Sequence, residues 1–252
     1  MKFESEIKKY RMIYDHHTHT VYSHGLGTIE DNVKAAHENG LEEIAITDHG
    51  PGHLNYGIDI SKLPEMRDEI ERLKAVYPDV NVLLGVEANT FRSEPYIDVS
   101  DRKDFDILLA GYHFGIRDAG MIPNWLSKHI IKKSTKSLLV YNTDMIINAL
   151  YYNEEKGNHI DILTHPGDKG PFDIEDIAKA CEDTKTLMEI NIKHPYLTIE
   201  GLKIAKKYDV NFVISSDAHI PENVGTFKPQ LLRALEAGID PERIINIKPV
   251  LE

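Results

Sequence analysis

Several histidines lie close together near the start of the chain, directly after its first apolar run. In the segment Asp15-His16-His17-Thr18-His19, an extended strand would point alternate side chains to the same face. His17 and His19 then face one point, while His16 and Thr18 face away from it. Neutral imidazole is the commonest metal ligand in proteins. A single His-x-His pair also arises by chance, so its meaning depends on the rest of the chain.

Residues of the same ligand types follow most of the later apolar runs. Each run is interpreted as a buried strand, and apolar residues at helical spacing separate one run from the next. Seven of the thirteen histidines and two acids lie at the ends of these predicted strands, and six of the seven strands supply at least one. The nine candidate metal ligands are His17, His19, His24, His49, Glu87, His113, His165, Asp217 and His219.

Strands that alternate with helices predict an α/β fold with a parallel sheet. Seven such units indicate a TIM-like (β/α)7 barrel, in which functional groups gather at the C-terminal ends of the strands. We predict strands over residues 12–14, 41–47, 80–86, 106–112, 161–164, 186–190 and 211–215. Helices are expected after the capping residues Thr28, Thr143 and Asp173, and also over 63–73, 197–207 and 229–237.

The chain of 252 residues is expected to form a single domain over 1–252. Residues 114–142 are the least regular part and hold the only tryptophan, Trp125, with Lys128, Lys132, Lys133 and Lys136. We interpret them as an irregular insertion with some helix near the mouth of the site. The alternative for these lysines is a solvated surface.

Composition restricts the function. The formal net charge of −12 disfavours binding to a nucleic-acid polymer, because phosphodiesters would be repelled. The single cysteine, Cys181, excludes an intrachain disulfide and a cysteine zinc finger. The start of the sequence is too charged for a signal peptide, and no run approaches the roughly 20 apolar residues that span a bilayer. We therefore expect a cytoplasmic protein without a membrane partner, and a homo-oligomer stays open.

Nine candidate ligands are too many for one zinc ion, which takes about four. They suit two or three divalent ions, with Glu87 and Asp217 as bridging carboxylates. Imidazole with carboxylate favours zinc, manganese or iron(II) over calcium or magnesium. Paired ions clamp an oxyanion and lower the pKa of bound water, so a metal-bound hydroxide would be the nucleophile. The chain lacks the Gly-x-Ser-x-Gly, Walker-type and Gly-x-Gly-x-x-Gly motifs of other reaction classes.

Taken together, the motifs resemble the polymerase and histidinol phosphatase (PHP) superfamily, and most of all its YcdX-type stand-alone metal-dependent phosphatases. They span most of the chain. They are Asp15-His16-His17-Thr18-His19, Thr47-Asp48-His49, Gly85-Val86-Glu87-Ala88-Asn89, Gly111-Tyr112-His113, Thr164-His165-Pro166-Gly167 and Ser216-Asp217-Ala218-His219.

The resemblance implies a distorted (β/α)7 barrel with a trinuclear site that hydrolyses phosphoesters. It implies three divalent metal ions, zinc first, with manganese and iron as alternatives. It assigns His17, His19, Glu87 and Asp217 to the first ion, Glu87, His113 and His165 to the second, and His24, His49 and His219 to the third.

Three functions stay open at this point. The first is a phosphatase for a small phosphomonoester such as histidinol phosphate or a nucleotide-like phosphate. The second is a nuclease or exonuclease, and the third is a metal-binding module without catalysis. Supporting roles are also open. Asp15 and Asp48 are candidates to orient imidazoles, and the candidates to hold the phosphate are Arg92, Arg117, Lys169 and Asn191.

Overall fold

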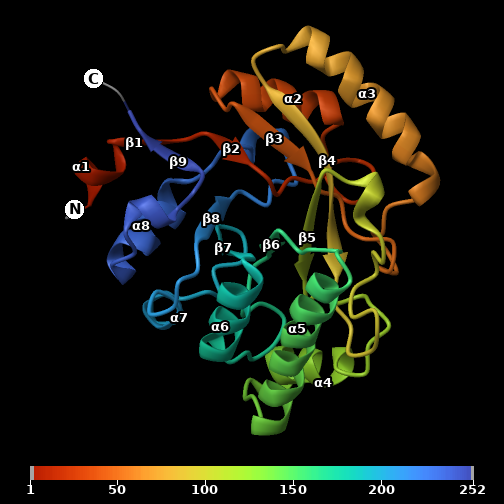
Figure 1. Cartoon of the computed structure of the whole chain (residues 1–252), viewed down its shortest axis with the longest axis vertical. Coiled ribbons are helices and arrows are strands. Elements are labelled where there is room, and N and C mark those ends of the chain that lie inside the picture. The colour runs from red at the N-terminus through yellow and green to blue at the C-terminus, as the bar shows by residue number, and fades with distance from the viewer. Residues whose placement is uncertain (1–2, 251–252) are drawn as a thin grey trace.

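Seven parallel strands form a nearly closed barrel with helices on its outside (Figure 1). The structure is a computed structural model that describes residues 3–250. Each strand pairs with the next in chain order, which confirms the predicted seven-stranded TIM-like barrel. The strands are β2 (Tyr14–Asp15), β3 (Glu43–Ile46), β4 (Asn81–Asn89), β5 (Ile107–Gly111), β6 (Ile162–Leu163), β7 (Leu187–Asn191) and β8 (Phe212–Ser215).

The helices begin where short polar residues can satisfy their first backbone N–H groups. Thr28 and Asp31 form a reciprocal capping box before the second helix, and Asp173 caps the sixth. The α-helices are α1 (Glu4–Ile7), α2 (Ile29–Glu38), α3 (Leu63–Val76), α4 (Met121–Leu126), α5 (Lys136–Glu155), α6 (Ile174–Thr184), α7 (Ile199–Ala205) and α8 (Lys228–Ala237). Four short 3-10 helices cover Ile60–Lys62, Arg102–Asp104, Pro221–Asn223 and Pro241–Arg243. Within residues 3–250, no helix has both the length and the apolar character needed to cross a membrane.

The irregular insertion is shorter than the predicted range of 114–142. Helix α5 begins at Lys136, with Thr135 as its N-cap, rather than after Thr143. The prediction was wrong because Thr143 lies inside the helix, where its hydroxyl donates to the carbonyl of Leu139. The preceding segment contains α4 and then a π-helical turn, Ser127–Ile131.

Two apolar cores hold the barrel together. The larger core lies between the sheet and the helices, and β3 contributes Ile44 and Ile46 to it. A separate cluster uses the alternate strand positions that face inward, namely Ala45, Ile107, Leu109, Ile162 and Val213. Because this cluster is fully packed, polar groups are confined to the ends of the strands.

The barrel has one seam, between its first and last strands. β2 and β8 form no ladder, and only an isolated bridge between Thr18 and Ala218 joins their C-terminal ends. Farther from the site, buried Asn246 fills the gap. Its Nδ2 donates to the carbonyls of Tyr14 (2.9 Å) and Ile214 (2.6 Å), and its Oδ1 accepts from Ile214 N (3.0 Å).

The chain ends are joined beside this seam. Strand β1 (Tyr10–Met12) pairs antiparallel with β9 (Ile247–Pro249) in a separate two-stranded sheet. The pairing of these two strands was not predicted from the sequence. The sheet fixes the entry of β2, which leads directly into His17 and His19.

Candidate metal centre

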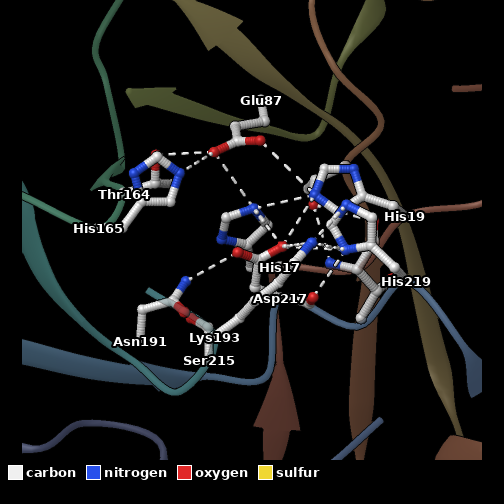
Figure 2. A network of polar contacts seen from close by, with 12 residues as sticks. His17, His19, Glu87, Thr164, His165, Asn191, Lys193, Ser215, Asp217 and His219 are labelled. Carbon is white, nitrogen blue, oxygen red and sulfur yellow. Dashed lines mark hydrogen bonds and ion pairs between the residues drawn. The ribbon is translucent and has the colours of Figure 1, made fainter. Parts of the chain in front are cut away.

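All nine candidate ligands lie together at the C-terminal ends of the strands. Figure 2 shows His17, His19, His165, Asp217 and His219 around Glu87. Eight of the nine form four overlapping groups whose ligand atoms lie within 4.8 Å of one another. The groups are His19, His49 and His219; His17, His165 and Asp217; His17, His19 and Glu87; and His49, Glu87 and His113. The ninth, His24, joins them through Nε2, which lies 2.6 Å from His219 Nε2. A pocket of about 280 Å³ opens over this cluster.

The segment that follows β2 presents alternate side chains in opposite directions. His17 and His19 turn inward, with their Nε2 atoms 3.2 Å apart. His16 turns away to Glu43 (Nε2 to Oε1, 2.7 Å), and the Thr18 hydroxyl donates to the carbonyl of Ala45. An extended backbone therefore places both inward imidazoles at one point, as their spacing predicts.

Glu87 lies at the centre of the cluster. On β4 it is in register with Leu109, so its side chain faces the barrel interior. Its Oε1 lies 2.9 Å from His165 Nε2, 3.1 Å from His113 Nε2 and 3.3 Å from His17 Nε2. Its Oε2 lies 2.9 Å from His49 Nδ1 and 3.6 Å from His19 Nε2. One carboxylate thus contacts five imidazoles from four segments of the chain.

In two of the histidines, His17 and His113, Nδ1 contacts an acceptor outside the cluster and Nε2 points to its centre. His17 Nδ1 lies 2.6 Å from Glu189 Oε1, and His113 Nδ1 lies 2.9 Å from Asn89 Oδ1. An acceptor at Nδ1 selects the tautomer with the proton there, so Nε2 presents its lone pair to the centre. Metal-binding histidines almost always have this arrangement.

Several inner atoms lie close together without a hydrogen bond. Glu87 Oε2 and His49 Nδ1 are 2.9 Å apart, yet neither has a hydrogen-bond partner. His19 Nδ1 and His24 Nδ1 are likewise buried without one. Buried polar atoms are normally paired. Imidazole and carboxylate donors that converge without pairing suit a shared divalent cation, so the residues present fit a metal cluster.

The electrostatics of the cluster favour the forms that bind metal. Burial raises the pKa of Glu87, but its interactions with His113 and His17 lower it more, so the net pKa is well below its usual range. Burial also lowers the pKa of His24 and His113 to about 3. Carboxylates without protons and neutral imidazoles are the ligand forms.

The pKa of His17 is raised, in contrast to the lowered pKa values of His24 and His113. Burial lowers its pKa, but the negative charges of Glu87 and Glu189 raise it, and the net pKa is well above its usual range. The carboxylates thus create a strongly negative potential at this ring, and the same potential attracts a divalent cation.

Two cluster residues have a strained backbone. His165 (φ 29°) and Asp217 (φ 51°) lie in the left-handed region just after β6 and β8. This conformation is uncommon for residues other than glycine, and it persists where the surrounding structure enforces it. The turn at each strand end aims the side chain across the barrel mouth.

Some of the residues predicted to hold the phosphate lie at the pocket, and others do not. Lys169 lines the pocket, whereas Arg92 and Arg117 do not. The Arg92 guanidinium instead donates to the carbonyl of Tyr141 and pairs with Asp144. Asn191 holds carboxylates, because its Nδ2 donates to Glu189 Oε2 and Asp217 Oδ2.

Asp15 and Asp48 do not orient imidazoles through their ring nitrogens. Asp15 accepts from the backbone N–H groups of Ser216 and Gly225. Asp48 accepts from the backbone and hydroxyl of Thr20 and from the hydroxyl of Ser23. Both buried acids therefore fix the loops that carry ligands.

The sequence analysis missed several residues of the site. Glu189 is the most important, because β7 was the one strand without a candidate ligand, and its acid within an apolar run was the available signal. Five more side chains line the pocket, namely His53, Tyr56, Phe114, Lys193 and His194. His194 Nδ1 lies 2.9 Å from Asp168 Oδ2, and Lys193 Nζ lies 2.8 Å from His219 Nδ1.

Known proteins share sequence with this chain over most of its length. The PHP domain model matches residues 15–193. The chain is 33% identical over 254 residues to a probable phosphatase of Caldanaerobacter subterraneus subsp. tengcongensis, with 94% of this chain and 87% of the relative covered. It is 31% identical over 253 residues to a probable phosphatase of Thermoanaerobacter sp., with 94% and 91% covered.

Solved structures share the fold. The crystal structure of histidinol phosphate phosphatase from Lactococcus lactis, complexed with zinc, L-histidinol and phosphate, is similar with a TM-score of 0.59 and 17% identity, over 92% of this chain and 94% of the other. A putative histidinol phosphatase from Listeria monocytogenes gives 0.62 and 16%, over 84% and 97%.

The barrel and its ring of imidazoles and carboxylates define a metal-dependent hydrolase of phosphoric esters, and the sequence relatives are named probable phosphatases. The chain belongs to the PHP domain family.

Proposed function

We propose that this protein hydrolyses a small phosphomonoester at a centre of three divalent metal ions, with zinc as the first candidate. The observation that carries the proposal is the convergence of nine donor residues, several with an inner atom that has no hydrogen-bond partner. Nine donors exceed the needs of one ion. The zinc in the Lactococcus neighbour supports the choice of metal.

The family resemblance supports a division of the donors among three ions. His17, His19, Glu87 and Asp217 would hold one ion, Glu87, His113 and His165 a second, and His24, His49 and His219 a third. When bound, such ions polarise a phosphoryl oxygen and activate water for attack on phosphorus. Glu87 contacts donors of all three sets, so its two oxygens suit a bridging role.

The remaining pocket residues supply charge for the substrate. Lys193 Nζ lies 4.0 Å from Asp217 Oδ1, and Lys169 also lines the pocket. Their ammonium groups would hold the phosphate oxygens that face away from the metal centre. The pocket of about 280 Å³ suits a small ester better than a polymer.

A metal analysis and a substrate panel test the proposal. The purified protein should contain about three divalent ions, and it should release phosphate from small phosphomonoesters faster than mononucleotides from a labelled oligonucleotide. L-Histidinol phosphate belongs in the panel. No turnover with zinc, manganese or iron(II) would overturn the proposal.

A matched pair of variants adds a control. Glu87→Gln should lose bound metal and at least about a hundredfold of activity, because it removes a charge that several ions would share. His159→Ala should keep both, because His159 pairs with Glu154 outside the pocket. Equal metal content in the two variants would contradict the assigned role of Glu87.

A further inference from the structure

A second pocket, of about 350 Å³, lies beside the metal centre. Four lysines line it, together with Tyr196 and two serines, and no aspartate or glutamate is among its described lining residues. We call it the basic pocket and define it by Lys128, Lys132, Lys133 and Lys169.

The charge of this pocket contrasts with that of the whole chain. The chain has 41 acids in 252 residues and a net charge of −12. Residues 119–143, which supply three of the four lysines, contain no acid at all. A local positive field in an acidic protein concentrates anions at this position.

The lysines of the basic pocket differ in their partners. Lys128 and Lys169 pair with buried Asp168 at 2.5 and 2.6 Å. In the described part of the chain, the ammonium groups of Lys132 and Lys133 have no ion pair and no hydrogen bond. Two of the four cations are therefore paired with one buried anion, and the charges of Lys132 and Lys133 are free for a ligand.

The backbone that carries these lysines is unusual. Lys128 lies on the π-helical turn Ser127–Ile131, and Lys132 follows it in the left-handed conformation (φ 53°). π-Helical turns and left-handed residues other than glycine are costly and are often retained at functional sites. The strained turn places Lys132 and Lys133 at the pocket.

The basic pocket adjoins the metal centre directly. Lys169 lines both pockets. Asp168 contacts Lys128 on one side and His194 on the other, and His194 Nε2 lies 3.5 Å from Asp217 Oδ2. Only two side chains thus separate Lys128 from a candidate metal ligand, so one small molecule can reach both places.

We propose that the basic pocket binds a second anionic group of the substrate while the metal centre holds the phosphate that is cleaved. This inference rests on the proposed phosphatase function and narrows its substrate class. The preferred substrate is a small phosphomonoester with a carboxylate or a second phosphate. An ester with an ammonium group at that position is disfavoured by repulsion.

A matched substrate series tests this proposal. Propane-1,3-diol monophosphate carries a terminal hydroxyl, and its relatives replace that hydroxyl by phosphate, carboxylate or ammonium. Longer alkanediol chains vary the spacing. We expect kcat/KM of the best ester with a second anionic group to exceed that of the hydroxyl ester by about tenfold and to fall with added salt, with the ammonium ester slowest. The carboxylate and phosphate arms identify the preferred anion.

Two double variants of exposed lysines locate the effect. K132A/K133A should reduce to about one the ratio of kcat/KM for the ester with a second anionic group to kcat/KM for the hydroxyl ester. It should leave kcat on the hydroxyl ester unchanged. K74A/K156A also removes two positive charges, one from α3 and one from the residue that follows α5. This variant should keep the preference for the ester with a second anionic group. Calorimetric binding of propane-1,3-bisphosphonate, whose C–P bonds are not hydrolysed, provides a readout without turnover, and K132A/K133A should weaken it.

The outcomes separate the two proposals. Equal hydrolysis of all esters, unchanged in K132A/K133A, overturns the second-anion subsite and leaves the phosphatase function in place. If no ester is hydrolysed, the proposed phosphatase function is wrong. Calorimetry then decides whether the basic pocket binds an anion. Weaker binding in K132A/K133A supports the anion subsite, and equal binding in both proteins overturns it.

Discussion

Glu189 shows how one residue outside the nine candidate ligands can control the metal centre. Its Oε1 accepts from His17 Nδ1 at 2.6 Å, and its Oε2 accepts from the backbone N–H of His165 at 2.6 Å. Both partners are candidate ligands. Burial raises the pKa of Glu189, but the charge of His17 and the hydrogen bond from it lower the pKa more, so the acceptor form is stable.

Replacing Glu189 by glutamine should weaken metal binding by about 10- to 100-fold while the protein stays folded. A glutamine amide would direct an N–H group at one of two donors, so either His17 or the loop at His165 loses its support. Titration against a chelating indicator measures the effect.

Glu154→Gln is the matched control for this change. Glu154 makes a similar contact, 2.6 Å from His159 Nδ1, but on an exposed surface. If both variants bind metal equally well, Glu189 has no positioning role.

At the scale of elements, Lys128 fastens the insertion to the loop after β6. Its ammonium contacts buried Asp168 and lies 4.2 Å from the centre of the Tyr196 ring. Burial raises the pKa of Asp168, but the hydrogen bond from His194 and the charges of His165 and Lys169 lower it strongly. The low pKa keeps Asp168 ionised, which is the form that attracts the ammonium of Lys128.

The sign of this shift predicts acid resistance. A carboxyl group with a depressed folded-state pKa stabilises the fold above its unfolded pKa of about 3.9 and loses this effect only as the pH falls further. The amides of residues 127–133 should therefore stay protected from hydrogen exchange down to about pH 4, after correction for the intrinsic rate.

Lys128→Met should raise the exchange of these amides, whereas Lys136→Met should not, because no side-chain partner of Lys136 is found in the described residues. Equal protection in both variants would show that other contacts hold the insertion.

The elements also show what a sequence pattern can and cannot reveal. Strand order and the caps Thr28 and Asp173 were predicted because apolar periodicity and capping chemistry are local. The π-helical turn was not predicted from the sequence. The early start of α5 was missed although its cap, Thr135, is local, because Thr143 was taken as the cap instead. Likewise, nothing in the sequence shows that Arg92 turns toward Asp144 while Lys169 turns into the pocket.

On the scale of the whole molecule, Asn246 closes the barrel where no ladder does. Asn246→Ala removes three buried hydrogen bonds and leaves backbone groups of β2 and β8 without partners. We expect a loss of about 3 kcal/mol in the free energy of unfolding. Urea denaturation at a fixed metal concentration measures it.

The exposed helix residue Asn148 provides the control. Asn148→Ala should change the free energy of unfolding by less than about 0.5 kcal/mol. A similarly small effect of Asn246→Ala would mean that the antiparallel pair β1 and β9 closes the barrel without help from this side chain.

The same seam has a consequence for the apo protein. His17 and His19 follow β2, and Asp217 and His219 follow β8, so a cation held between them would cross-link the two strands that backbone pairing leaves almost unjoined. When a chelator removes the metal, β2 and β8 should therefore separate before the other strands do. Amide exchange should then be faster at His19 and Ala218 than in β4 and β5. At a hundred times its dissociation constant, one such ion adds about 2.7 kcal/mol of stability, so metal supply would also govern how long the folded enzyme survives.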